Sequence, residues 1–255
     1  MDEKRDKYEG DVGIKVTGGF PEKLANFWYH YKWHTIALLF TVFVIVVCTV
    51  QCASNTRYDI QVLYAGNHAF GRTSDDGGFS EYATAVSTLE SLTKDHDGNG
   101  EVNVTFLDLY LLTKDEIAEI EKAPDSNQLS YQLLQENSTM LKNNLDMSDY
   151  YVCFLSERLF RQYSEGEANL GRFAKISGYA KDGAEYDYVS EYGIRLSSLD
   201  VKDLPGISLL DADDTVVCIR NVSAMSSMFG RDTSEEQFRR GEDMLRTILS
   251  YTSSK

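Results

Sequence analysis

The chain has 255 residues and a formal net charge of −15, from 25 basic and 40 acidic side chains. Residues 1–33 carry six side chains of each sign, so the whole excess of negative charge lies after them. A surface of this sign repels nucleic acid and anionic lipid, which argues against a nucleic-acid-binding protein. About 200 residues follow position 53, enough for one domain with its own core.

An uninterrupted apolar run near the start is the strongest signal in the chain. Residues 36–50 contain no charged residue, no proline and no glycine, and residues 33–53 add up to 21 positions. A helix needs about 20 residues to cross the hydrocarbon core of a bilayer. The run therefore predicts a transmembrane helix over residues 34–53, with the lipid bilayer as its first partner.

The basic residues on either side of this run predict its orientation. Six precede it, whereas the 20 residues after Ala53 contain only Arg57 and Arg72. Because basic residues stay on the cytoplasmic side, we expect a cytoplasmic tail over residues 1–19 and an extracytoplasmic C-terminal part. A cleaved signal peptide and a lipoprotein site at Cys52 are the alternatives, but the charged leader is long and Gln51 is unusual before a lipidated cysteine.

The approach to the membrane has a pattern of its own. Leu24, Phe27, Trp28 and Tyr31 follow one another at i, i+3, i+4 and i+7, which places them on one face of a helix. Trp and Tyr favour the headgroup level of a bilayer. We interpret residues 20–33 as an interfacial amphipathic helix that sets the depth of the membrane segment.

The remaining chain reads as alternating strands and helices after a short stalk, residues 54–57. Strands are predicted over residues 58–65, 102–112, 150–155 and 215–220. Helices are predicted over residues 79–94, 113–122, 125–145, 156–163 and 234–251. Residues 164–193 have no clean period and predict loops or a small hairpin. The alternation predicts one α/β domain over residues 58–255, with a mainly parallel, mixed sheet flanked by helices.

One loop of this domain resembles the start of a calcium-binding loop. Oxygen-bearing side chains alternate with other residues, and a glycine at the sixth position permits a sharp bend. The candidate ligands are Asp95, Asp97, Asn99, Glu101 and Asn103. The twelfth position, where a bidentate Glu is expected, is Phe106, so Asp108 is considered as a substitute. The alternative is a turn built from favoured turn residues. If calcium binds, we expect a structural role and no catalytic one.

Few other residues suggest chemistry. Residues 65–79 follow the first strand, and the carboxyl ends of parallel strands are where ligands bind, so they form the default pocket wall. The sequence contains none of the familiar hydrolase, metalloprotease or phosphate-loop motifs, so no catalytic residue is assigned and we expect no enzyme. Cys153 and Cys218 lie in strand-like segments and are expected to be buried thiols, with a bridge only if those strands are neighbours.

Two stretches resemble known proteins. Residues 27–35, which are very aromatic and lead into the apolar helix, resemble the N-terminus of uncharacterised single-pass membrane proteins of Gram-positive gut bacteria. The helix–turn–strand at 79–110 and the helix that ends at 145–149 before strand 150–155 are similar to the same proteins. The second pattern also resembles one lobe of an extracytoplasmic solute-binding protein, although about 200 residues are too few for two lobes.

The resemblance and the residues together predict a function class. We expect a non-enzymatic binding or interaction module on the outer face of a bacterial cell membrane, with an envelope protein as partner. The alternative is a reduced solute- or signal-sensing lobe that binds a small ligand at the carboxyl ends of its strands. An envelope enzyme of unknown class is a third interpretation.

Overall fold

The computed structural model describes residues 19–53, 58–73, 79–122, 130–165, 171–180 and 185–252. The predicted stalk and almost all of the predicted cytoplasmic tail lie outside these residues. The chain divides into two compact units, Met1–Thr56 and Arg57–Lys255, and each is described by itself.

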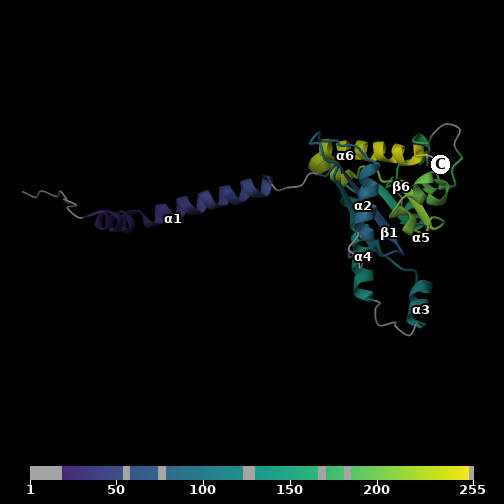
Figure 1. Ribbon diagram of the computed structural model, residues 1–255, viewed down its shortest axis with the longest axis horizontal. Coiled ribbons are helices and arrows are strands. Elements are labelled where there is room, and N and C mark those ends of the chain that lie inside the picture. The colour runs from purple at the N-terminus through teal and green to yellow at the C-terminus, as the bar shows by residue number, and fades with distance from the viewer. Residues whose placement is uncertain are drawn as a thin grey trace, which may run out of the picture. The chain divides into compact units, whose positions relative to one another are not determined.

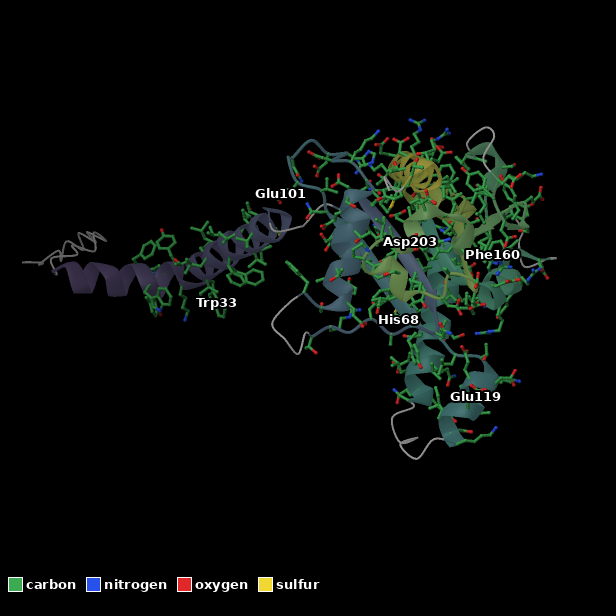
Figure 2. All side chains as sticks on the ribbon, turned by 45° about the vertical axis from the view of Figure 1, so that its right-hand side comes forward. Trp33, His68, Glu101, Glu119, Phe160 and Asp203 are labelled. Carbon is green, nitrogen blue, oxygen red and sulfur yellow. The ribbon has the colours of Figure 1, made fainter. Side chains whose placement is uncertain are left out.

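The first unit contains a single long helix, α1 (Phe20–Ala53). The interfacial and membrane segments predicted from the sequence are parts of this one helix. Within its stretch Phe27–Val50, the most apolar 18 residues have a mean hydropathy of 2.3, and none of these 18 is buried among the described residues. Apolar side chains thus face outward all along it, and Trp33 in particular is 73% exposed (Figure 2). The helix is long and apolar enough to span a membrane, although a signal sequence shares these features.

The second unit is built on a six-stranded mixed sheet with the order β2-β1-β3-β6-β5-β4. Figure 1 labels β1 and β6 of this sheet together with the helices of the same unit. Strands β1 (Ile60–Gly66), β2 (Val104–Tyr110) and β3 (Val152–Ser156) pair in parallel. Strand β6 (Thr215–Ile219) is antiparallel to β3. The short hairpin of β4 (Tyr188–Ser190) and β5 (Gly193–Arg195) completes the sheet, with β5 antiparallel to β6.

Five α-helices of the described chain accompany this sheet. They are α2 (Glu81–Ser91), α3 (Lys114–Lys122), α4 (Tyr131–Met147), α5 (Glu157–Ser164) and α6 (Ala224–Ser250). Short 3₁₀ turns lie at Ile176–Gly178, Leu196–Ser198, Asp200–Asp203 and Ile207–Leu209. Ser80 caps α2 by accepting a hydrogen bond from the N–H of Ala83, and Ser130 caps α4 in the same way through Leu133.

The two faces of the sheet support two separate cores. Alternate residues of β1 point to opposite faces, as the pleat of a strand requires. Val62 and Tyr64 join the cluster that contains α2 and α6, whereas Leu63 and Ala65 join the cluster that contains α4 and α5. The strands buried on both faces are therefore almost continuously apolar, which is why they were recognisable in the sequence.

The observed fold confirms a mixed α/β domain and corrects the prediction in two details. The sheet is not mainly parallel, because only the β1–β2 and β1–β3 pairings are parallel and the other three are antiparallel. Helix α6 begins ten residues earlier than predicted. The small hairpin considered for residues 164–193 is present, because β4 pairs with β5 and the two strands extend the sheet beyond β6.

Candidate metal centre

The loop between α2 and β2 folds around its own acidic side chains. The carboxylate of Asp95 accepts the backbone N–H groups of Gly98 at 2.6 Å and Gly100 at 2.8 Å. Both glycines have positive φ, 72° and 91°, which other residues adopt only with strain. The backbone N–H of Gly100 is the largest cause that holds the pKa of Asp95 below its usual value, so this side chain is a carboxylate at neutral pH.

The next residues of the loop also form short-range hydrogen bonds between side chains and the backbone. Asp97 accepts the backbone N–H of Asn99 at 3.0 Å, and its second oxygen accepts the side-chain amide of Asn99 at 3.1 Å. The side-chain oxygen of Asn99 accepts the N–H of Glu101 at 2.7 Å. These short-range bonds are Asx-type turns, which fix the loop before any ligand is considered.

A buried aspartate from another part of the chain ties this loop to the sheet. Asp59, just before β1, is fully buried. One of its oxygens accepts the N–H of His96 at 2.7 Å, and the other accepts the N–H of Asn103 at 2.9 Å. In return, the backbone N–H of Asp59 donates to the carbonyl of Asn103 at 2.9 Å. The carboxylate thus bonds to both ends of the loop. These hydrogen bonds replace the ones to water that the carboxylate lost on burial.

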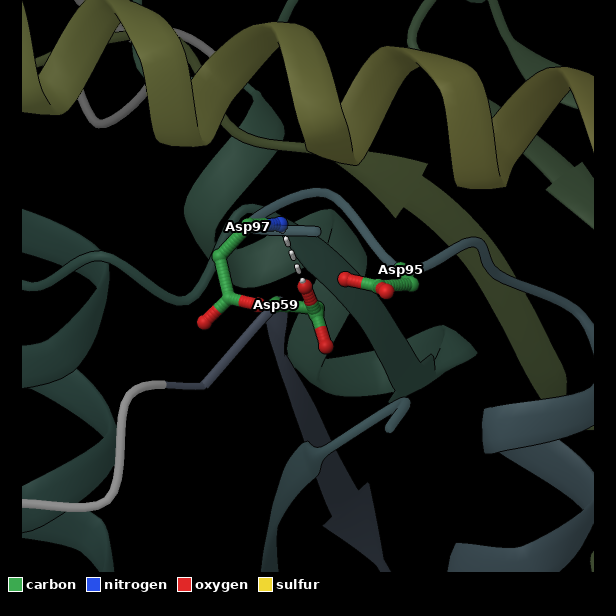
Figure 3. Close-up of side chains that lie close together, drawn as sticks. All are labelled: Asp59, Asp95 and Asp97. Atoms are coloured by element: carbon green, nitrogen blue, oxygen red, sulfur yellow. Dashed lines mark hydrogen bonds between the residues drawn. The ribbon is translucent and has the colours of Figure 1, made fainter. Parts of the chain in front are cut away.

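Three carboxylates meet at this point, as Figure 3 shows. One oxygen from each of Asp59, Asp95 and Asp97 lies within 4.8 Å of the others. Carboxylate oxygens are the ligands that hard cations such as Ca²⁺ prefer. The triad has the chemistry to hold a metal ion, with one buried and two exposed side chains.

The predicted ligands do not all belong to this triad. Asp95 and Asp97 do, whereas Glu101 is exposed and lies outside it. Asn99 uses its side-chain oxygen within the loop, and Asn103 contributes its backbone N–H and C=O to Asp59.

The suggested substitute ligand, Asp108, was wrong. It lies near the carboxyl end of β2, whereas the loop enters that strand at its amino end, and Asp108 pairs with Arg72. Four residues of strand separate it from Val104, which is roughly 13 Å at about 3.3 Å per residue.

Asp59 is the residue that sequence reasoning missed. Neighbouring parallel strands begin at the same edge of a sheet, so an acid just before β1 must lie beside the loop that leads into β2. The signal was therefore present in the expected pairing of these two strands.

The default pocket wall, described for residues 65–73 and 79, forms a paired network at the opposite edge of the sheet. Asn67 donates to Glu116 at 2.9 Å, and His68 lies 3.4 Å from Glu81. Arg72 pairs with Asp108 and stacks on Tyr82. Burial raises the pKa of Asp108 above its usual value even though Arg72 opposes the shift. Residues 74–78 lie outside the described part of the chain.

Comparisons with protein families, with curated proteins and with solved structures found no match.

Proposed function

We propose that this chain is a single-pass membrane protein that displays its α/β domain, residues 58–255, outside a bacterial cell as a non-enzymatic binding or interaction module. The observation that carries the proposal is helix α1, which contains an apolar 18-residue window within Phe27–Val50 of which none is buried among the described residues. Exposing so much apolar surface to water is unfavourable, whereas a bilayer solvates it.

The distribution of charge supports the proposed orientation. Six basic residues lie before position 34, the last two of them (Lys23 and Lys32) within the first turns of α1, and the domain after α1 carries the whole net charge of −15. A cytoplasmic N-terminus follows from the positive-inside rule. The acidic domain then stands away from the anionic inner leaflet, in the space where an envelope protein partner is available.

Protease treatment of intact cells tests this topology. The chain would carry one tag at the N-terminus and another at the C-terminus. We expect the C-terminal tag to disappear and a fragment with the N-terminal tag and α1 to survive. Permeabilised cells, in which both tags disappear, provide the control. A C-terminal tag that survives in intact cells, or a mature chain that begins beyond Cys52, would contradict the proposal.

The interaction module is favoured over a sensing lobe by the contacts at the carboxyl ends of β1 and β2. A ligand there would have to replace the ion pair between Arg72 and Asp108 and the hydrogen bond that Asn67 donates to Glu116. The parallel β2-β1-β3 half keeps the sensing lobe as the second candidate, because this is the arrangement in which ligands bind at strand ends. A thermal-shift screen with sugars, amino acids and peptides separates the two, since a clear shift supports sensing.

We also propose that the acidic triad binds Ca²⁺ as a structural clip. The support is the convergence of Asp59, Asp95 and Asp97 and the restriction of the loop by Gly98 and Gly100. An ion there would offset the mutual repulsion of three carboxylates and strengthen the link between β1 and the loop.

Thermal unfolding of the detergent-solubilised chain tests the calcium clip. Millimolar CaCl₂ is expected to raise the melting temperature by several degrees, and Asp97→Asn is expected to abolish the rise. Glu101→Gln is the matched control, because Glu101 belongs to the same loop but not to the triad. An absent calcium effect, or an equal loss in the control, would leave the loop as a turn alone.

A further inference from the structure

The neighbouring strands β1 and β3 send the chain to opposite faces of the sheet. After β1 the chain leads to α2, whose Ala85 and Leu89 pack on one face. After β3 it leads to α5, whose Leu159 and Phe160 pack on the other face. In open α/β sheets, the carboxyl ends of two such strands form a switch point, and ligands bind there because the diverging segments leave room between them.

Three adjacent strands place a hydroxyl group at this switch point, on the face that α2 covers. Tyr64 of β1 belongs to the core cluster of that face. Ser156 of β3 and Thr215 of β6 point to the same side, because each lies two residues from a strand residue of this cluster. Ser156 and Thr215 are in register. A Cβ on Gly66 would lie 2.5 Å from the hydroxyl of Tyr64, so this ring reaches over the last residue of β1.

Two of these hydroxyls are buried without a hydrogen bond. Ser156 and Thr215 are only 8% and 3% exposed, and neither side-chain oxygen has a partner among the described residues. The hydroxyl of Tyr64 accepts the backbone N–H of His68 at 3.0 Å, but its own proton has no acceptor among these residues. Buried polar groups are nearly always paired, so an exception on three neighbouring strands calls for an explanation.

Carboxylates around the hydroxyls determine the sign of a ligand. Asp211 and Asp214 precede β6, and Glu116 lies in the first turn of α3. Burial is the largest cause that raises the pKa of Tyr64, and the charges of these three acids raise it further, so all three lie within electrostatic reach of its hydroxyl. The pKa of Asp214 is also raised, first by burial and then by Asp211. Such a site repels an anion and attracts a cation.

The spacing of these carboxylates favours an organic cation over a metal ion. Among the described residues, three carboxylate oxygens converge within 4.8 Å in the acidic triad, whereas those of Asp211, Asp214 and Glu116 do not. One metal ion therefore does not reach all three. Hydroxyl and carboxylate oxygens accept hydrogen bonds, and an ammonium group donates three. A primary amine supplies these donors, and its carbon chain bridges the wider spacing.

We propose that the switch point binds a small organic amine, whose ammonium group lies between the hydroxyls of Ser156 and Thr215 and the carboxylate of Asp214. The ion pair between Arg72 and Asp108 stays in place, because β2 lies on the other side of β1 from β3. This inference rests on the binding role in the proposed function and names a ligand class for it. It does not depend on the membrane anchor.

Thermal unfolding of the detergent-solubilised chain with 1,4-diaminobutane tests the proposal. EDTA is present throughout to remove divalent metal, and KCl keeps the ionic strength equal in all samples. Millimolar diamine is expected to raise the melting temperature by about 3 °C. The diol 1,4-butanediol, which has hydroxyls in place of the two amines, is expected to leave it unchanged. No effect of the diamine, or an equal effect of the diol, would overturn the proposal.

Variants of single carboxylates locate the binding. Asp214→Asn is expected to weaken diamine binding at least fivefold, as measured from the concentration dependence of the melting temperature. Asp213→Asn is the matched control, because Asp213 is an exposed neighbour in the same turn. Asp97→Asn, which alters the acidic triad at the opposite edge of the sheet, is also expected to keep the response. An equal loss in either control would show binding to general acidity or to the triad, and would contradict the proposal.

A hydroxyl variant separates ligand binding from a structural role. Thr215→Val keeps the shape of the side chain and removes the unpaired hydroxyl. The free chain is expected to be at least as stable as the native one, because an unpaired buried polar group is costly, whereas diamine binding is expected to weaken at least threefold. Lower stability with unchanged binding would indicate a structural hydroxyl and refute the proposal. The protease experiment measures the anchor separately, so a failure here is distinguished from a failure of the topology.

Discussion

At the scale of single residues, Asp59 shows how one buried side chain can organise a distant loop. Its carboxylate accepts the backbone N–H groups of His96 and Asn103, which lie about 40 positions further along the chain. Buried N–H groups without an acceptor are costly. The charge of Asp59 is therefore stabilised by the loop, and the loop is held by Asp59.

Asp59→Ala is expected to lower the free energy of unfolding by about 1–3 kcal/mol, because it leaves the partly buried N–H groups of His96 and Asn103 without their acceptor. Urea denaturation of the detergent-solubilised chain, followed by near-ultraviolet circular dichroism, measures this loss. Glu101→Ala serves as the control for the same loop and is expected to change stability by no more than about 0.5 kcal/mol. Similar losses in both variants would contradict the anchoring role.

The two buried cysteines face each other across neighbouring strands, which meets the condition for a bridge. Cys153 is in register with Cys218, and both are buried and free. Arg220 donates its backbone N–H to Tyr151, and hydrogen-bonded pairs alternate along an antiparallel ladder. The cysteines therefore occupy a hydrogen-bonded pair, where side chains lie further apart than a relaxed disulfide requires.

We expect both cysteines to remain thiols. Burial also raises the pKa of the Cys218 thiol, so the reactive thiolate is disfavoured. In a Cys48→Ser, Cys52→Ser background, a maleimide reagent should label no cysteine in the native chain and both after denaturation. Mass spectrometry under non-reducing conditions checks the result, and a 153–218 linked peptide would contradict it.

At the scale of elements, the segment that contains Pro205 and Gly206 docks on α2. Thr88 donates its hydroxyl to the carbonyl of Pro205 at 2.7 Å. A Cβ on Gly206 would lie 2.5 Å from the Cα of Ala85, so only glycine fits between the two backbones. Gly206 also has a φ of 79°, which adds a conformational reason for glycine.

Two glycine variants separate the effect of the contact with Ala85 from the effect of the positive φ. Gly171 has a similar φ of 75°, but a Cβ there would meet no atom within 4 Å. Gly171→Ala is expected to cost about 1 kcal/mol from strain alone, and Gly206→Ala about 2 kcal/mol more because the backbones must separate. Chemical denaturation of both variants measures the difference, and equal losses would show that α2 moves away freely.

At the scale of the whole domain, ion pairs between elements set the response to acid. Glu157 opens α5 and pairs with Arg195, at the end of β5, at 2.6 Å. This hydrogen bond, followed by the one from Arg161, holds the pKa of Glu157 below its ordinary value of 4.5. The folded state therefore favours the ionised carboxylate, and this stabilisation is present above about pH 4.5 and lost as pH falls further.

Glu157→Gln is expected to lower stability at pH 7 by roughly 1–2 kcal/mol, with a difference from the native chain that shrinks below pH 4.5. Denaturation curves measured between pH 3 and pH 7 check the trend. Glu165→Gln is the control, because its pair with Arg161 is exposed and contributes no more than about 0.5 kcal/mol. A difference that stays constant with pH would contradict the assignment.

The sequence alone was sufficient for features that depend on local pattern. The apolar run predicted the long helix α1, because its length and composition need no tertiary contact to be recognised. Strands buried on both faces, such as β1 and β3, were recognisable in the sequence as nearly continuous apolar segments. The alternation of these strands with helices predicted the α/β class, and the spacing of Asp95 and Asp97 pointed to the loop where the structure brings three carboxylates together.

Only the tertiary structure decided which distant residues meet. The antiparallel position of β6, the added β4–β5 hairpin and the place of Asp59 beside the loop depend on how the strands are ordered in the sheet. The same holds for Asp108, which pairs with Arg72 near the carboxyl end of β2, away from the loop. Periodicity records which side of an element is buried but not which element covers it, so pairings across long sequence separations stay undetermined until the chain packs.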